Sequence, residues 1–290
     1  MDGIINLLKP AGMTSSDCVM NVRRIVGEKK VGHTGTLDPN ACGVLPVCVG
    51  KATRLIEYMD MSAKSYLCEA ILGYTSDTLD IWGETVKDSK DPDYFSEEVL
   101  RNCIKSLEGE RLQYPPAYSA VKVGGKPLYS YARSGESVEV KPRKIFIEKT
   151  ELISVKDNRI TFTVNCSKGT YIRSLCADIG EMLGCGCIMS FLLRTEAAGL
   201  KVQDSVSLEE LSAAKDNAFT GMFSSAESAV AHLPAINISE EQLKLFINGN
   251  NTFSEGIDYT GELAAVFCGS VFAGTAVWRS GRYAAEKVIK

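Results

Sequence analysis

A β-hairpin pattern followed by a helix pattern constrains the fold of this chain most strongly. Two strand-like stretches, Ile145 to Val155 and Arg159 to Cys166, flank Asp157-Asn158, a turn signal of the kind that joins antiparallel strands. The next stretch, Thr170 to Leu183, carries apolar residues at helical spacing. Elsewhere, strand and helix patterns are mixed without regular βαβ alternation. We therefore predict an α+β fold with a mixed, largely antiparallel sheet flanked by helices.

The remaining segments extend this prediction to the whole chain. We expect helices at 14–26, 52–59, 96–107, 127–133, 207–214 and 240–247, and strands at 65–72 and 117–123. The pattern changes near His232-Leu233-Pro234, so we predict a larger domain over residues 1–232 and a small β-rich module over residues 233–290. An uncharged run of 16 residues, Leu263 to Trp278, is shorter than the roughly 20 that a membrane-spanning helix needs. We interpret this run as two strands with a turn.

Cysteine and histidine content argues against a metal site. Ten cysteines are scattered along the 290 residues without a C-x-x-C pair, and the two histidines are His33 and His232. The N-terminal segment has no basic region ahead of its short apolar run, so it does not resemble a signal peptide. Scattered cysteines without an export signal indicate reduced thiols, and we expect a cytoplasmic protein that does not bind a membrane.

Charge is distributed unevenly along the chain. The net charge is −4, but residues 111–145 carry seven basic and two acidic side chains, whereas residues 201–265 carry three basic and ten acidic ones. A basic stretch inside an acidic protein is typical of a face that docks a polyanion such as RNA. An ordinary solvated hairpin would have the same composition, so charge alone leaves both interpretations open.

The stretch "VGHTGTLDPNACGVLPVCVGKATR", Val31 to Arg54, has the glycine content of a phosphate-binding loop. A P-loop, however, has glycine five positions before its Gly-Lys pair and Ser or Thr after the lysine. Around Gly50-Lys51 these positions hold Leu45 and Ala52, and the sequence has no G-x-G-x-x-G either. Both nucleotide-binding motifs are therefore excluded.

The same stretch contains a single carboxylate, Asp38, directly before Pro39. An Asp-Pro pair most often organises a turn. The functional alternative is a carboxylate nucleophile or base, which needs a cation to keep it ionised once it is buried. Gly32 and Gly35 permit backbone conformations that bring the chain close to a ligand. These residues alone do not decide between the two interpretations.

Two other segments offer candidate partners for Asp38. In "CSKGTYIRSL", Arg173 lies in the first turn of the predicted helix, where a cation opposes the helix dipole, so a reason of burial or pairing is expected. The alternative is an arginine that extends along the surface. In "KSYLCEAILG", Tyr66 begins a predicted strand, a position more often occupied by a core tyrosine than by a catalytic one.

Five segments together resemble the TruB-type pseudouridine synthases, which convert uridine 55 in the T loop of tRNA to pseudouridine. They are "INLLKPAGMTS", "VGHTGTLDPNACGVLPVCVGKATR", "KSYLCEAILG", "PPAYSAVKVGGKPLYSYARSG" and "CSKGTYIRSLCADIGEMLGCG", and they span about Ile4 to Arg194. The resemblance implies a pseudouridine synthase fold over residues 1–232 with a PUA-like module over residues 233–290. It implies that Asp38 is the catalytic aspartate, that Tyr66 stacks on the target base and takes the C5 proton, and that Arg173 pairs with Asp38.

The resemblance also implies substrate contacts. His33 matches a histidine that takes the place of the flipped-out base, which costs a few kcal/mol to extrude. Asp80 matches a second acidic residue that contacts substrate, although Leu79, Ile81 and Trp82 around it depart from the family pattern. Further RNA contacts are expected from Tyr171, Lys168, Lys122, Lys126 and Arg133.

Residues 124–141 resemble a "thumb" insertion that closes on the tRNA stem-loop and that guide-RNA-dependent relatives lack. Its presence implies an enzyme that reads the T-arm stem-loop of tRNA itself, without guide RNA, and we expect a monomer. The reaction breaks the N1–C1′ bond and rejoins the base through C5, with no redox change or group transfer, so no cofactor is required.

Three other functions remain as alternatives. An RNA-binding or tRNA-folding module with little catalysis would not depend on Asp38. A guide-dependent catalytic subunit would need added protein and RNA to convert bare tRNA. A metal- or nucleotide-dependent enzyme would lose activity in EDTA, although the motif comparisons above disfavour it.

Overall fold

The computed structural model describes residues 1–60, 62–88, 95–248 and 259–289. The chain forms two compact units. Unit 1 comprises Met1–Asp38, Val44–Asp60 and Ala198–Lys290, and unit 2 comprises Pro39–Gly43 and Met61–Ala197. The chain therefore passes from unit 1 to unit 2 directly after Asp38.

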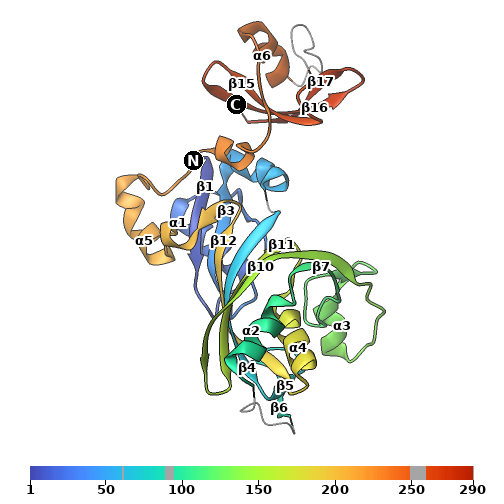
Figure 1. Ribbon diagram of the computed structural model, residues 1–290. Coiled ribbons are helices and arrows are strands. Elements are labelled where there is room, and N and C mark those ends of the chain that lie inside the picture. The colour runs from blue at the N-terminus through green and yellow to red at the C-terminus, as the bar shows by residue number, and fades with distance from the viewer. Residues whose placement is uncertain (61, 89–94, 249–258, 290) are drawn as a thin grey trace. The chain divides into compact units, whose positions relative to one another are not determined.

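Unit 2 is built on an antiparallel sheet with strand order β12-β4-β11-β10-β7 (Figure 1). Its strands are β4 (Ala63–Leu72), β7 (Gly109–Gln113), β10 (Arg143–Lys156), β11 (Arg159–Ser167) and β12 (Cys187–Ala197). Cys42 and Gly43, the first residues of β3 (Cys42–Val49), add a short parallel pairing to β12. The predicted α+β class with a mixed, largely antiparallel sheet is confirmed.

Two helices cover this sheet in unit 2. Alternate residues of β11 are buried, as the period-2 pattern requires for a strand with one covered face. α2 (Glu97–Lys105) packs against β10, and α4 (Ile172–Leu183) packs against β12 and β4. Ser96 caps α2 by accepting a hydrogen bond from Val99 N, and α4 ends at Gly184, which has φ 68°. The predicted hairpin and both helices are confirmed.

Two small hairpins complete unit 2. The first is formed by β5 (Tyr74–Ser76) and β6 (Thr85–Lys87). The second, β8 (Lys122–Val123) and β9 (Lys126–Pro127), leads into α3 (Leu128–Ser134) and turns at Gly124-Gly125, as predicted.

The predicted strand at 117–123 is wrong for all but Lys122 and Val123. The carbonyls of this segment bind other partners: Tyr118 O accepts from Arg173, Ser119 O from Tyr129 N, and Val121 O from Leu128 N. The carbonyls at these three positions are thus engaged by a side chain and by the start of α3 rather than by a neighbouring strand.

Unit 1 contains the N-terminal elements and the acidic segment after residue 197. β3 is hydrogen-bonded to β1 (Gly3–Lys9) and pairs with β2 (Val31–His33). α1 (Ser15–Val26) and the 3₁₀-helix η1 (Gly50–Tyr58) flank these strands in sequence. Leu211 and Phe219 join Ile5, Val19 and Val47 in one buried apolar cluster. The acidic segment is therefore part of this core. Its elements are β13 (Leu200–Lys201), η3 (Val202–Asp204), α5 (Leu208–Ala213), η4 (Ala214–Asn217) and η5 (Ala226–Val230).

A four-stranded sheet with the order β14-β15-β16-β17 forms the C-terminal part of unit 1. Its elements are β14 (Ala235–Asn237), α6 (Glu240–Ile247), β15 (Leu263–Cys268), β16 (Val271–Arg279) and β17 (Arg282–Val288). The helix at 240–247 and the division of the Leu263 to Trp278 run into two strands are confirmed. These C-terminal elements have an apolar cluster of their own, in which Phe246 and Tyr283 are fully buried.

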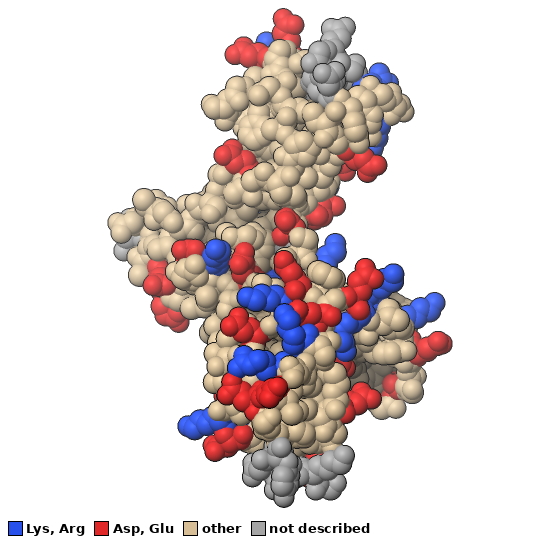
Figure 2. Space-filling model, in the orientation of Figure 1, with Lys and Arg blue, Asp and Glu red and all other residues tan. Residues whose placement is uncertain are grey.

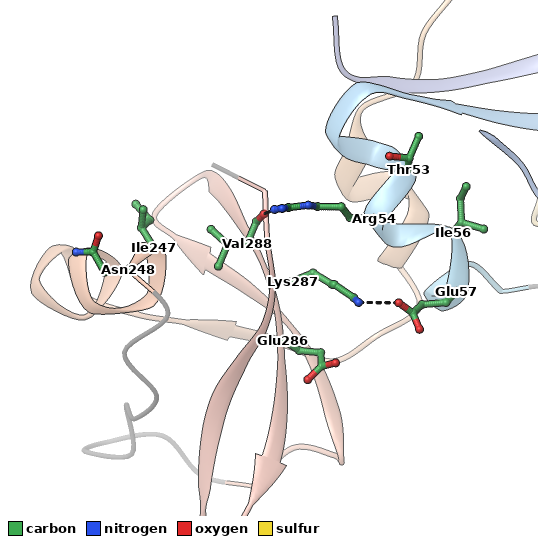
Figure 3. Close-up of a pocket in the computed structure, with 9 residues that line it drawn as sticks. All are labelled: Thr53, Arg54, Ile56, Glu57, Ile247, Asn248, Glu286, Lys287 and Val288. Carbon is green, nitrogen blue, oxygen red and sulfur yellow. Dashed lines mark hydrogen bonds and ion pairs between the residues drawn. The ribbon is translucent and has the colours of Figure 1, made fainter. Parts of the chain in front are cut away.

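Polar contacts join η1 to β17 (Figure 3). Arg54 Nη1 donates to Val288 O at 2.7 Å, and Lys287 Nζ lies 2.8 Å from Glu57 Oε1. Beside them is an open cavity of about 770 Å³ that none of the three candidate catalytic residues lines. Among the helices within the described ranges, none has the length and apolar character needed to span a membrane.

Candidate active site

Asp38 lies in the loop between β2 and β3 and is half-buried. Hydrogen bonds at Thr34 and at Leu37 hold the backbone of this loop in place. Ser15 Oγ accepts a hydrogen bond from Leu37 N at 3.0 Å and donates one to Leu37 O at 3.2 Å, and Thr34 N donates to Pro46 O at 3.0 Å. Ser15 and Leu37 are both buried. The backbone directly before Asp38 is thus held by a side chain at the start of α1.

Replacing Ser15 by alanine is expected to lower both the stability of the protein and the turnover of a reaction that uses Asp38. The change removes both hydrogen bonds to Leu37 and leaves its buried N–H and C=O unpaired, a loss of about 1–3 kcal/mol in the free energy of unfolding. Since Asp38 follows directly, a misplaced carboxylate should lower turnover by about tenfold or more. Urea denaturation and single-turnover kinetics measure the two effects, and Ser16→Ala, at an exposed position next to Ser15, is the matched control.

His33 lies in unit 1 at the end of β2. Its Cα is paired with that of Val47 on β3, and its side chain is half-buried. The residue therefore begins the loop that carries Asp38, five positions before it. Its role as a filler for the flipped base stays a prediction.

Tyr66 lies on β4 of unit 2 and is 6% exposed. Its neighbour across the sheet is Arg194 on β12, a fully buried cation. Burial lowers the pKa of Arg194, whereas its hydrogen bond to the Tyr66 phenol favours the charged form. The guanidinium therefore fixes the phenol oxygen in place.

Arg173, the second residue of α4, is 4% exposed and has three identified partners in unit 2. Its Nη1 donates to Thr78 O and its Nη2 to Tyr118 O, both at 2.9 Å. Nη1 also lies 3.7 Å from Asp80 Oδ2 in an ion pair. The burial or pairing reason that a cation at a helix N-terminus calls for is therefore present.

Asp80 is 8% exposed and is held from several sides. Its Oδ1 accepts from Thr78 Oγ1 at 2.6 Å and from Trp82 N at 3.1 Å. Backbone hydrogen bonds between Leu79, Ile81 and Met189 attach this segment to β12. Leu79 has φ 63°, a left-handed conformation that is unfavourable for leucine and is often found beside functional residues.

Lys168 and Tyr171 lie directly before α4. Gln113 Nε2 donates to Tyr171 O at 3.1 Å, and Tyr171 N donates to Gln113 Oε1 at 2.8 Å. Gln113 is buried, so the residue before α4 is anchored to β7 on both backbone groups. Lys168 is exposed in the turn after β11, where its backbone N–H donates to Ser62 O.

The predicted thumb-like segment, residues 124–141, contains Lys126 and Arg133, and Lys122 lies just before it. Lys122 and Arg133 are exposed, and the Arg133 guanidinium lies 5.7 Å from the centre of the Tyr129 ring. Lys126 Nζ lies 4.4 Å from the Tyr131 ring centre and 3.4 Å from Glu136 Oε1. Cations stacked on tyrosines are suited to bind phosphates and unpaired bases.

The face of unit 2 seen in Figure 2 carries Lys and Arg side chains interspersed with Asp and Glu. Paired charges of unit 2 include Lys149 with Glu151 at 3.6 Å and Arg159 with Glu69. No uninterrupted positive patch is therefore visible on this face.

Lys64, half-buried on β4, belongs to a cluster of cations near Tyr66. Burial, together with Arg194 and Lys168, lowers the pKa of Lys64 from 10.5 to about 8. Because this folded-state pKa is below the unfolded one, the charged amine destabilises the fold below about pH 8, and the effect fades as the pH rises towards 10.5.

Replacing Lys64 by methionine is therefore expected to raise the free energy of unfolding by about 1–3 kcal/mol at pH 7. The gain should shrink between pH 7 and pH 10, because the folded wild type loses the proton in that range. Urea denaturation at both pH values measures it. Lys168→Met, at an exposed position, should show no comparable gain, and a Lys64→Met gain that does not change with pH would contradict the argument.

Three residues of the site were not identified from the sequence. Ser15 lies at the start of the helix expected at 14–26, where Thr14 is the N-cap, and its side chain binds the Asp38 loop. No motif or spacing in the sequence marks Gln113 as a site residue. Arg194 could have been found, since a charged residue that ends the apolar run "FLLR" calls for a partner if that run is buried.

The candidate residues are divided between the two units. Asp80, Tyr171 and Arg173 lie on connected segments of unit 2, with Tyr66 and Lys168 in the same unit, whereas His33 and Asp38 lie in unit 1. The pairing of Arg173 with Asp38 stays a prediction. Within the described ranges, no group of three or more His, Cys, Asp or Glu side chains is arranged to hold a metal ion.

Comparison with known proteins assigns two consecutive segments of the chain to the same family. Residues 23–172 match the family model for the TruB family pseudouridylate synthase N-terminal domain, and residues 173–231 match that for the tRNA pseudouridylate synthase B C-terminal domain. A tRNA pseudouridine synthase B of Alkaliphilus oremlandii is 40% identical over 97% of this chain and 94% of its own length. Its namesake in Clostridioides difficile is 50% identical over 73% of this chain and 70% of its own length.

Solved structures share the fold. A chain of a Cbf5-Nop10-Gar1 complex is similar over 99% of this chain and 85% of its own length, with a TM-score of 0.76 and 27% identity. A chain of an H/ACA RNP bound to a substrate RNA containing 2'-deoxyuridine gives the same coverage and TM-score at 25% identity.

Proposed function

The chain belongs to the TruB family of pseudouridylate synthases, and on that premise we propose that it isomerises uridine 55 in the T loop of tRNA to pseudouridine. It acts in the cytoplasm as a monomer, without guide RNA or cofactor, and Asp38 is the catalytic carboxylate. The observation that carries the proposal is that all three candidate catalytic residues are held in place. Ser15 binds the backbone before Asp38, Arg194 binds Tyr66, and Asp80 pairs with Arg173.

The residues have separate tasks in this proposal. Asp38 attacks the sugar C1′, adds to the base at C6 or removes a sugar proton, and in each case the N1–C1′ bond breaks and a C5–C1′ bond forms. Tyr66, oriented by Arg194, stacks on the base and takes the C5 proton. Arg173 keeps Asp38 ionised, because a neighbouring cation favours the charged carboxylate. His33 fills the space of the flipped base.

RNA recognition is assigned to the segments around this centre. Lys126 and Arg133 contact the stem-loop from the thumb-like segment and Lys122 from just before it, and Lys168 and Tyr171 contact it from the residues that precede α4. The C-terminal sheet serves as a PUA-like module that contacts the acceptor arm. Support comes from the cation–tyrosine pairs at Lys126 and Arg133, which present charge and ring faces together.

The test uses unmodified tRNA transcript labelled with tritium at uridine C5, with no other protein or RNA added. Tritium release, together with mapping of pseudouridine to position 55, is the expected result, and a transcript with cytidine at position 55 should release none. EDTA should have no effect. Release only after guide RNA and partner proteins are added would contradict the standalone function, and modification at another position would contradict the assigned substrate.

A further inference from the structure

Three thiols meet in the interior of unit 2. Cys68 on β4 and Cys176 on α4 are fully buried, and Cys187 on β12 is 3% exposed. The sulfur atoms of Cys68 and Cys176 are 3.7 Å apart, and the Cys187 side chain is hydrogen-bonded to Cys176. The proposed isomerisation uses none of them.

The three thiols differ in their readiness to ionise. Hydrogen bonds from Cys187 and Cys68 lower the pKa of Cys176, whereas the hydrogen bond to Cys176 and burial raise the pKa of Cys187. Buried thiols outside the cluster behave differently: burial raises the pKa of Cys166 to about 11 and that of Cys48 to about 12. Because the thiolate is the reactive form, Cys176 is the nucleophile of the cluster.

A cavity gives small molecules a route towards the cluster. It has a volume of about 410 Å³ and lies entirely in unit 2. Cys187 lines it, together with Ala177 and Gly180 of α4. Helix α4 approaches β12 closely here, since a Cβ on Gly180 would lie 2.2 Å from Cys187 N. One residue of the cluster, Cys187, thus lines a cavity that can admit a small peroxide, and its side chain is hydrogen-bonded to Cys176.

We propose that this cluster is a redox modification site, in which hydrogen peroxide or a small organic peroxide converts Cys176 and Cys68 to a reversible disulfide. The Cys176 thiolate attacks one peroxide oxygen and the O–O bond breaks, which gives a sulfenic acid and, with a proton, water or an alcohol. The Cys68 sulfur then attacks Cys176 Sγ, the S–O bond breaks, and water leaves with the Cys68 proton. The two thiols lose two electrons, and the peroxide gains them.

The disulfide would act on residues of the candidate site. Cys176 lies one helical turn after Arg173 on α4, and Cys68 lies two residues after Tyr66 on the same face of β4. Closing the sulfur atoms from 3.7 Å to the bonded distance of about 2 Å pulls α4 and β4 together. A displacement of this size lowers turnover by about tenfold or more, a consequence that rests on the proposed function.

The first test does not depend on activity. Wild-type protein is treated with hydrogen peroxide, its remaining thiols are alkylated, and its peptides are mapped by mass spectrometry without reduction. We expect a peptide pair linked through Cys68 and Cys176 that disappears after dithiothreitol. It should be absent in Cys176→Ala and in Cys68→Ala and retained in Cys166→Ala, a buried thiol outside the cluster. Failure to find the pair in the wild-type protein, or a bond between other cysteines, would overturn the proposal.

The second test measures tritium release before and after peroxide. Wild type and Cys166→Ala should lose about tenfold or more of their rate and regain it with dithiothreitol, while Cys68→Ala should keep its rate. Loss of rate in Cys68→Ala equal to that of wild type would overturn the coupling to the site. A linked peptide in a protein that never releases tritium would instead contradict the proposed function and leave the redox site standing.

Discussion

Asp38→Asn is expected to lower the rate of tritium release by at least about 10⁴-fold, because the amide can serve neither as nucleophile nor as base. The substitution keeps the shape of the side chain and the loop contacts made by Ser15 and Thr34, so the fold should be preserved. It also removes one negative charge from the protein, so RNA binding should not weaken. The measurement is single-turnover release together with the affinity for the T-arm stem-loop.

A matched control separates catalysis from general effects of charge. Asp204 is an exposed carboxylate elsewhere in unit 1, and Asp204→Asn should release tritium at the wild-type rate. Retention of a rate within tenfold of wild type by Asp38→Asn would remove Asp38 from catalysis. It would favour an RNA-binding or tRNA-folding module that keeps the fold without the chemistry.

Local patterns in the sequence were sufficient for the helices and for the central hairpin of the sheet. The hairpin around Asp157-Asn158 and the helix ending at Gly184 follow from turn chemistry and apolar spacing, which act over a few residues. The strand expected at 117–123 failed because its carbonyls are occupied by Arg173 and α3, contacts that depend on residues distant in sequence or on the next helix. The acidic segment gave no sign that Leu211 and Phe219 would join the core of unit 1.

The candidate site shows the same division. Asp38, Tyr66 and Arg173 became candidates because whole motifs resembled a family, since each residue singly was as consistent with a turn, a core position or a surface cation. The identified partners of Arg173 could not be read from the sequence: Asp80 lies 93 positions away along the chain. Ser15 is 22 positions from Leu37, and only the tertiary fold shows that it holds the Asp38 loop.

Removing the Arg173 side chain is expected to have the largest effect on stability among the substitutions considered. Arg173→Met leaves Asp80 as a buried carboxylate without its cation and leaves the carbonyls of Thr78 and Tyr118 without their donor. Loss of one partner of a buried ion pair lowers the free energy of unfolding by about 3–5 kcal/mol. Urea denaturation measures this, and Arg111→Met is the control, because the Arg111–Asp178 pair at 4.0 Å is only partly buried and should contribute about 1 kcal/mol or less.

Arg173→Lys and Asp80→Asn distinguish holding the fold from supporting the reaction. In Arg173→Lys the lysine keeps the positive charge beside Asp80, so the variant should retain most of its stability. Lysine lacks the planar fork that reaches both carbonyls, so turnover should fall by about 100-fold. Asp80→Asn keeps the hydrogen bonds that Arg173 donates to the Thr78 and Tyr118 carbonyls, and a turnover loss of about tenfold is expected if Asp80 orients the guanidinium. The double variant should then show a coupling of about 1–3 kcal/mol. Strictly additive effects would mean that Arg173 acts in catalysis independently of Asp80, and an Arg173→Met protein as stable as Arg111→Met would contradict the buried ion pair itself.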